Sequence, residues 1–84
     1  MNNKPNYPPK LLKIYELGEK GETFKLRLVD GRTVECKLDM ITYANDPEDE
    51  DKDILVAFVY YSNNLGELFA EDDIVEVISD NTID

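Results

Sequence analysis

The sequence predicts a mainly β fold, a five-stranded antiparallel barrel preceded by a short helix. Three observations lead to this prediction. Apolar and polar residues alternate along several short segments, turn residues separate these segments, and 84 residues suit a single domain. We expect the barrel domain to span residues 10–78, between a flexible arm at residues 1–9 and a frayed tail at residues 79–84.

Residues 10–17 are expected to form the helix. A pair of prolines precedes this segment and Gly18 follows it, which is the usual arrangement at the two ends of a helix. Leu11 and Ile14 would share one face, and the helix must pack against another part of the protein because two helical turns are marginal alone. A strand through Leu12 and Ile14 is the alternative for the same residues.

The next two strands are expected to form a hairpin around Asp30-Gly31, because glycine tolerates the positive φ of a tight turn. On either side of this turn the apolar residues recur with period two. The alternation changes phase where Met40 and Ile41 are adjacent, which predicts a bulge or bend near residue 40. The inward positions of the two strands are expected to be Phe24, Leu26, Leu28, Val34, Cys36, Leu38 and Met40.

Three more strands are expected after residue 53. Residues 54–62 are apolar on both faces, as is typical of a central strand. Residues 66–70 would form a short strand with Leu68 inward, residues 71–73 a single helical turn, and residues 74–78 the last strand. We expect the core to contain Phe24, Leu26, Leu28, Val34, Leu38, Val56, Phe58 and Val77.

The spacing of Leu26, Leu28, Gly31, Val34 and Leu38 looks like the hydrophobic-and-glycine pattern of the first Sm motif. With the order of the expected elements, residues 10–78 resemble the Sm-like version of the SH3-like barrel. The second glycine of the motif is replaced by Cys36, and the residues with which the family binds RNA are missing in register. The resemblance therefore implies a fold and no RNA-chaperone activity.

Charge limits the classes of partner. The net charge is −10, and it is uneven: residues 1–45 carry a balance of +2 and residues 46–84 a balance of −12. Nucleic acids and anionic lipids are bound through Lys and Arg, so this chain should repel both of them. A protein with a basic surface is the better electrostatic match.

The segment from Asn45 to Asp53 is expected to be a solvated acidic loop, since it holds no hydrophobic residue. It lacks the central glycine and terminal glutamate of an EF-hand, so we expect no metal site there. Adjacent Tyr60 and Tyr61 must face opposite sides of their strand, which places one of them off the core. The candidate partner-binding residues are Asp46, Glu48, Asp49, Glu50, Asp51, Asp53, Tyr60 and Tyr61.

The sequence gives little support for catalysis. Cys36 is the single cysteine, it is expected to be a small buried hydrophobe, and the chain has no histidine to activate it. A carboxylate pair involving Asp39 is the arrangement left open for acid–base chemistry. We therefore expect a protein that is not an enzyme, with no catalytic residues and no cofactor.

These observations favour a small acidic interaction module of a bacterium or phage that binds a protein partner through its surface. The alternative is an inhibitor that mimics nucleic acid and occupies the cleft of a DNA- or RNA-binding protein. The lone cysteine and the lack of a long apolar run indicate a cytoplasmic protein. A ring like those of Sm-like barrels would crowd the acids of the last two strands, so we expect a monomer or weak homodimer.

Overall fold

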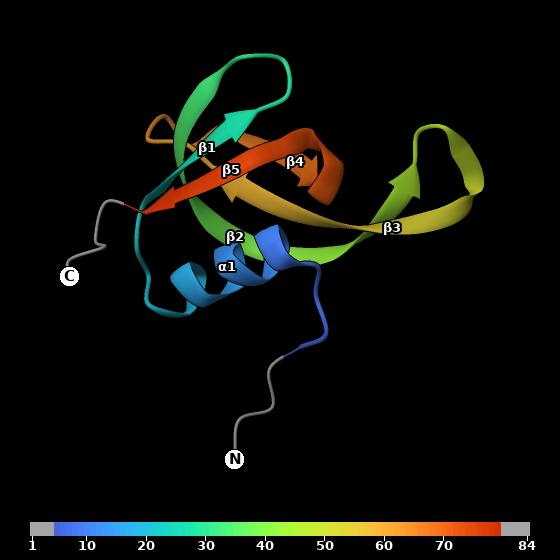
Figure 1. The fold of residues 1–84 in the computed structure, drawn as a ribbon, viewed down its shortest axis with the longest axis horizontal. Helices are drawn as coiled ribbons and strands as arrows, with labels where there is room; N and C mark the ends of the chain where they lie inside the picture. The colour runs from blue at the N-terminus through green and yellow to red at the C-terminus, as the bar shows by residue number, and fades with distance from the viewer. Residues whose placement is uncertain (1–4, 80–84) are drawn as a thin grey trace.

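Five antiparallel strands form one sheet in the order β4-β3-β2-β1-β5, with a helix packed against it (Figure 1). The computed structural model describes residues 5–79, so much of the expected arm and tail lies outside the described residues. Within the expected N-terminal arm at residues 1–9, the Tyr7 ring packs edge-on against Tyr15, with ring centroids 5.6 Å apart. The prediction of a mainly β, five-stranded antiparallel fold with a short helix is confirmed. The elements are α1 (Pro9–Glu19), β1 (Phe24–Leu28), β2 (Thr33–Asp46), β3 (Asp49–Tyr60), β4 (Gly66–Ala70), the 3-10 turn η1 (Glu71–Asp73) and β5 (Ile74–Ser79).

Helix α1 packs on the sheet through one apolar face. Leu11, Ile14 and Leu17 are buried there and belong to the hydrophobic core, so the alternative of a strand over this segment is wrong. Gly18 allows a close approach to β2, because a Cβ at this position would lie 2.4 Å from Leu38 Cδ2. The helix thereby contacts β2, β5 and β3.

The N-terminus of α1 is capped from a distant part of the chain. The backbone amides of Lys10 and Leu11 donate to the two carboxylate oxygens of Glu71 in η1, at 3.2 and 3.0 Å. Pro8, which precedes the helix, offers no side-chain cap. Because the first amides of a helix lack partners within it, this carboxylate satisfies groups that would otherwise need water.

The β1–β2 hairpin turns at Asp30-Gly31, as predicted. Gly31 has a φ of 96°, a backbone angle that residues with a Cβ rarely adopt. The Leu28 amide donates to the Arg32 carbonyl at 2.8 Å, and the Asp30 carboxylate accepts from the Arg32 amide at 2.9 Å. These bonds close the turn and fix the antiparallel register of the two strands.

The predicted bulge is present, but it places Met40 on the opposite face of β2 from the one predicted. The register of β2 against β3 shifts between Leu38 and Met40, so an extra residue reverses the faces of the positions that follow. Met40 is consequently half-exposed, and the prediction that it points inward is wrong. Ile41 packs against the core in its place.

The face of β3 that meets the main core is the opposite of the predicted one. Ala57 and Val59 belong to the core, whereas Phe58 is only half-buried on the opposite face, so its assignment to the core is wrong. Val56 is buried, yet it shares that outer face and lies outside the main cluster. Both faces of this strand are apolar, so a period of two cannot show which one meets the core. Of the eight predicted core positions, all but Phe58 are buried or pack against the core: Phe24, Leu26, Leu28, Val34, Leu38, Val56 and Val77.

The same ambiguity affects β4. Phe69 is buried and Leu68 is half-exposed, so the prediction of an inward Leu68 is wrong. The two residues are adjacent in a five-residue strand, which is too short for its pattern to choose a face. On the outer face a Cβ at Gly66 would lie 2.5 Å from a ring carbon of Phe58. The Phe58 ring therefore covers the glycine.

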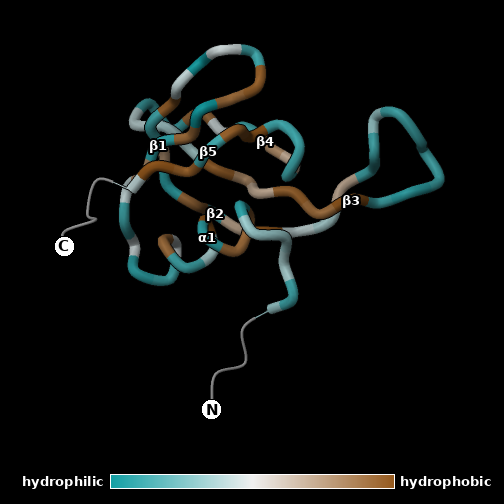
Figure 2. The backbone as a smooth tube through the Cα atoms, in the orientation of Figure 1, coloured by the Kyte–Doolittle hydropathy of each residue, from teal (hydrophilic) through white to brown (hydrophobic). Residues whose placement is uncertain are grey.

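The segment expected to be a solvated loop is instead part of a β-hairpin. β2 continues to Asp46 and β3 begins at Asp49, with a tight turn between them. The register passes from Asn45 opposite Asp53 directly to Asp46 opposite Asp49, so residues 50–52 bulge from β3. Backbone pairing does not require apolar side chains, and the charges stay in water on the outside of the ribbon. We call residues 43–55 the arm, as distinct from the expected N-terminal arm at residues 1–9. It extends from the sheet in Figure 1, and Figure 2 shows its hydrophilic tip.

Candidate functional site

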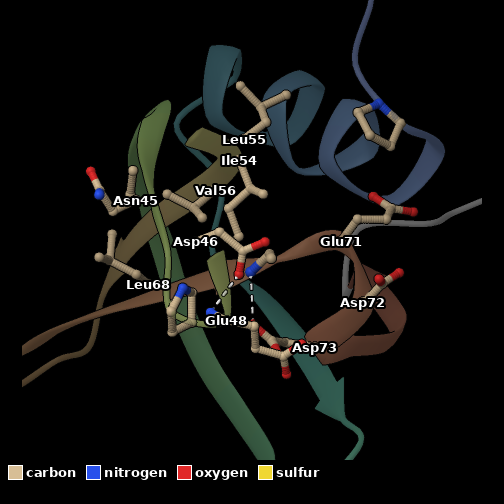
Figure 3. A pocket seen from close by; sticks show the side chains of 14 residues that line it. Asn45, Asp46, Glu48, Ile54, Leu55, Val56, Leu68, Glu71, Asp72 and Asp73 are labelled. Carbon is tan, nitrogen blue, oxygen red and sulfur yellow. Dashed lines mark hydrogen bonds between the residues drawn. The ribbon is translucent and has the colours of Figure 1, made fainter. Parts of the chain in front are cut away.

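A groove with a volume of about 620 Å³ lies between the tip of the arm and the β4–η1 corner. We call it the acidic groove. Figure 3 shows side chains from the arm, β3, β4 and η1 around it. Its lining residues are Pro8, Ala44, Asn45, Asp46, Pro47, Glu48, Ile54, Leu55, Val56, Leu68, Ala70, Glu71, Asp72 and Asp73.

The floor of the acidic groove is apolar. Ala44 pairs with Ile54 across β2 and β3, and Val56 pairs with Ala70 across β3 and β4. These side chains share the outer face of the sheet, because alternate residues of a strand point to the same side. Leu68 continues this face and is 50% exposed. Three strands thus build an apolar surface that the core does not use.

The rim of the groove carries five carboxylates from two elements. Asp46 and Glu48 come from the arm, and Glu71, Asp72 and Asp73 come from η1. No Lys or Arg lines the groove among the residues that the structure describes. The local potential is therefore negative, and the low-dielectric floor strengthens it.

Two rim carboxylates are held in place by hydrogen bonds from backbone amides nearby in the sequence. The Asp46 carboxylate accepts from the Glu48 amide at 2.9 Å, and the Asp73 carboxylate accepts from the Ala70 amide at 2.9 Å (Figure 3). A carboxylate has about four acceptor positions, so these oxygens can still accept from a ligand.

The residues predicted to bind a partner fall in three places. Two of the six predicted acids, Asp46 and Glu48, line the groove. The other four are exposed along the rest of the arm: Asp49, Glu50, Asp51 and Asp53. Tyr60 is 37% exposed on the outer face, whereas Tyr61 packs against the core. Both tyrosines border a different hollow, next to Cys36, so the structure does not bring them together with the acids.

Sequence reasoning missed the η1 carboxylates and the apolar floor. Residues 71–73 were assigned correctly as one helical turn, but nothing in their spacing shows that they face a hairpin tip about 25 positions earlier. The floor was missed because Leu68 and Phe58 were placed in the core. A sequence signal was present in the apolar outer face of residues 54–60, which is more apolar than a solvated face requires.

Tyr61 is tied to a polar network at the edge of the sheet. Its hydroxyl donates to the Glu67 carboxylate, which also accepts from Arg32 at 3.3 Å, and Arg32 pairs with Asp30 at 2.8 Å. Burial and the hydrogen bond to Glu67 raise the pKa of the Tyr61 phenol. This network links the β1–β2 turn to β4, and it serves the fold rather than the groove.

Cys36 is a buried thiol, and burial together with the nearby Glu35 charge raises its pKa from 9.0 to about 12. The unfolded chain therefore releases this proton at a lower pH than the folded chain. Stability should be unaffected below about pH 9, then fall by about 1.4 kcal/mol per pH unit as pH rises towards about 12. Urea unfolding at about pH 8 and about pH 10 should show a larger loss for the wild type than for Cys36→Ala. An equal loss in both would contradict a buried, protonated thiol.

Within residues 5–79, no group of three or more His, Cys, Asp or Glu side chains is placed to hold a metal ion. No helix of the described residues combines the length and the apolar character needed to cross a membrane. The geometry of the acidic groove is therefore the main guide to function, since comparison with known protein families, curated proteins and solved structures gives no match for this chain.

Proposed function

We propose that this protein is a small acidic, non-catalytic interaction module that binds a protein partner with a basic surface. The observation that carries the proposal is the acidic groove, in which carboxylates from the arm and from η1 surround an apolar floor. Such a surface offers charge for recognition and apolar area for affinity. The net charge of −10 strengthens the attraction of a basic partner.

We also propose that the sheet closes into an Sm-like barrel. The strand order and the N-terminal helix support this, as do two contacts that bring the β1–β2 turn to the other edge of the sheet. The Val29 amide donates to the Asp73 carbonyl at 3.1 Å, and Arg32 pairs with Glu67. The like charges of the last two strands favour a monomer or weak homodimer in solution.

Mimicry of nucleic acid is the second candidate, and one observation favours it. The acids of residues 46–53 lie on an ordered β-ribbon rather than in a loose loop, and a mimic needs acids at fixed spacing along one face. Under this hypothesis the partner would be a protein that binds DNA or RNA, and its nucleic acid would displace the module.

The test is a capture experiment with immobilised protein in lysate of the source organism, at about 0.05 M and about 0.5 M salt. Two double variants have the same charge: Glu50→Lys with Asp53→Lys on the arm, and Glu35→Lys with Asp39→Lys elsewhere on β2. Each replacement adds two charges, so both change the net charge from −10 to −6. We expect basic proteins in the bound fraction, weaker capture at high salt, and a larger loss for the arm variant.

Capture that is independent of salt, or a bound fraction of acidic proteins, would contradict the proposal. Competition with added DNA and RNA separates the two candidate functions. Displacement of the captured protein by nucleic acid indicates mimicry, and capture that survives it indicates an ordinary interaction module.

A further inference from the structure

We infer that the acidic groove binds an extended basic segment of the partner, with a Lys or Arg side chain lying along the apolar floor. This inference rests on the proposed function and makes it specific. The methylene stem of the bound residue would pack on Ile54 and Leu68. Its cationic head would lie between the carboxylates of the arm tip and those of η1.

The floor fits such a stem because it is apolar and accessible. Lys and Arg carry three or four methylene groups that pack well on apolar surface while the charged head stays near water or a carboxylate. Leu68 is 50% exposed and Ile54 is partly exposed, so these two side chains provide the accessible apolar area, whereas Val56 is buried. A purely acidic surface would attract a cation but would offer no area for its stem.

The rim fits the cationic head because its carboxylates come from opposite sides. Asp46 and Asp73 are fixed by backbone hydrogen bonds, and Glu71 is fixed by the amides of Lys10 and Leu11. Acceptors that are already ordered lose little entropy on binding. A guanidinium has five donors in a rigid fork, so arginine should bind more tightly here than lysine.

Charge and volume select a basic segment over other occupants. A second copy of this chain would bring its own net charge of −10 to an acidic rim, and a nucleic acid would bring phosphates. The groove volume of about 620 Å³ lies within the range of sites that hold a small ligand, about 300–1,000 Å³. It therefore accommodates a few side chains of an extended peptide, while the remainder of the partner lies outside.

Fluorescence anisotropy with a labelled peptide of alternating Leu and Arg tests this inference on the full chain. Leu68→Ser and Asp72→Lys alter the groove. The matched controls are Val75→Ser, since Val75 is 51% exposed on β5 and Leu68 is 50% exposed, and Asp39→Lys, which changes the net charge equally outside the groove. We expect about tenfold weaker binding for each groove variant and less than about twofold for each control. A peptide with Glu in place of Arg should show no binding.

Circular dichroism establishes that each variant is folded before its affinity is compared. Equal weakening by Asp72→Lys and Asp39→Lys would mean diffuse electrostatic attraction. That result overturns the inference that the groove is the binding site, while the proposed function stands. Failure of the wild type to bind the Leu–Arg peptide, with basic proteins still captured from lysate, overturns the same inference. Failure of both experiments overturns the proposed function itself.

Discussion

Replacing Val59 with aspartate is expected to prevent folding. Val59 is fully buried in β3, where its strand partners are Leu38 of β2 and Glu67 of β4. A carboxylate at this position would have to remain charged in an apolar interior or take up a proton, and either costs several kcal/mol. A domain of this size has a total stability of only about 5–15 kcal/mol. Circular dichroism and amide chemical-shift dispersion should show an unfolded or partly folded chain.

The matched control is Tyr60→Asp on the next residue of the same strand. Tyr60 faces outward and is 37% exposed, so its replacement should change the free energy of unfolding by no more than about 1 kcal/mol. The pair therefore reports directly on which face of β3 meets the core. Normal folding of Val59→Asp would show that the faces are assigned the wrong way, and equal damage by both variants would show that β3 is buried on both faces.

Removal of the Glu71 carboxylate should give the second largest effect. Glu71→Ala takes away both acceptors from the amides of Lys10 and Leu11, and Pro8 cannot replace them. We expect a loss of about 1.5–3 kcal/mol in the free energy of unfolding, as for charge-assisted bonds at a helix N-terminus. Glu71→Gln keeps one acceptor oxygen without the charge and should lose about half as much.

Urea denaturation measures this difference, and the neighbouring residue supplies the control. Asp72 lies in the same 3-10 turn and is exposed, so Asp72→Ala should cost less than about 0.5 kcal/mol. If Glu71→Ala and Asp72→Ala are equally stable, the distant cap does not hold α1 in place. Glu71 also lines the acidic groove, so its variants are unsuitable for the binding experiment.

The parts of the fold that were predictable are those governed by local chemistry. Asp30-Gly31 is a strong turn signal, and the strands on either side of it alternate cleanly, so the hairpin follows from the sequence. Its register, with Leu26 opposite Val34 and Arg27 opposite Thr33, was not predicted. The helix was predictable from the two prolines at its start and from its apolar residues. Its end was misplaced, because Gly18 lies within α1 and the glycine with positive φ that follows the helix is Gly21. The bulge was predictable because Met40 and Ile41 interrupt the alternation.

The faces of β3 and β4 were not predictable, because they depend on tertiary packing. A strand that is apolar on both sides, such as residues 54–60, meets the core with the face that α1 happens to cover. The same holds for Leu68 and Phe69, which are similarly hydrophobic but differ strongly in burial. The groove follows from these choices, so its apolar floor could not be recognised before the sheet was assembled.

The acidic segment was misjudged for a different reason. Its charge run is typical of a loop, but strand pairing between β2 and β3 continues past the last apolar pair. The backbone hydrogen bonds gained by pairing do not depend on side-chain hydropathy. The acids were therefore recognised as a candidate binding feature while their order and direction were not.

The shape of the arm has a consequence for how copies of the chain behave at high concentration. On the edge of β3 that faces away from β2, pairing with β4 begins only at Val56. Among the described residues, the ribbon before Val56 therefore leaves backbone donors and acceptors of β3 at an open edge. Such edges recruit strands from other molecules and begin aggregation. Asp49, Glu50, Asp51 and Asp53 lie along this stretch, and two arms carrying them repel each other. The carboxylates that would draw in a basic partner thus also keep separate copies from growing into a shared sheet.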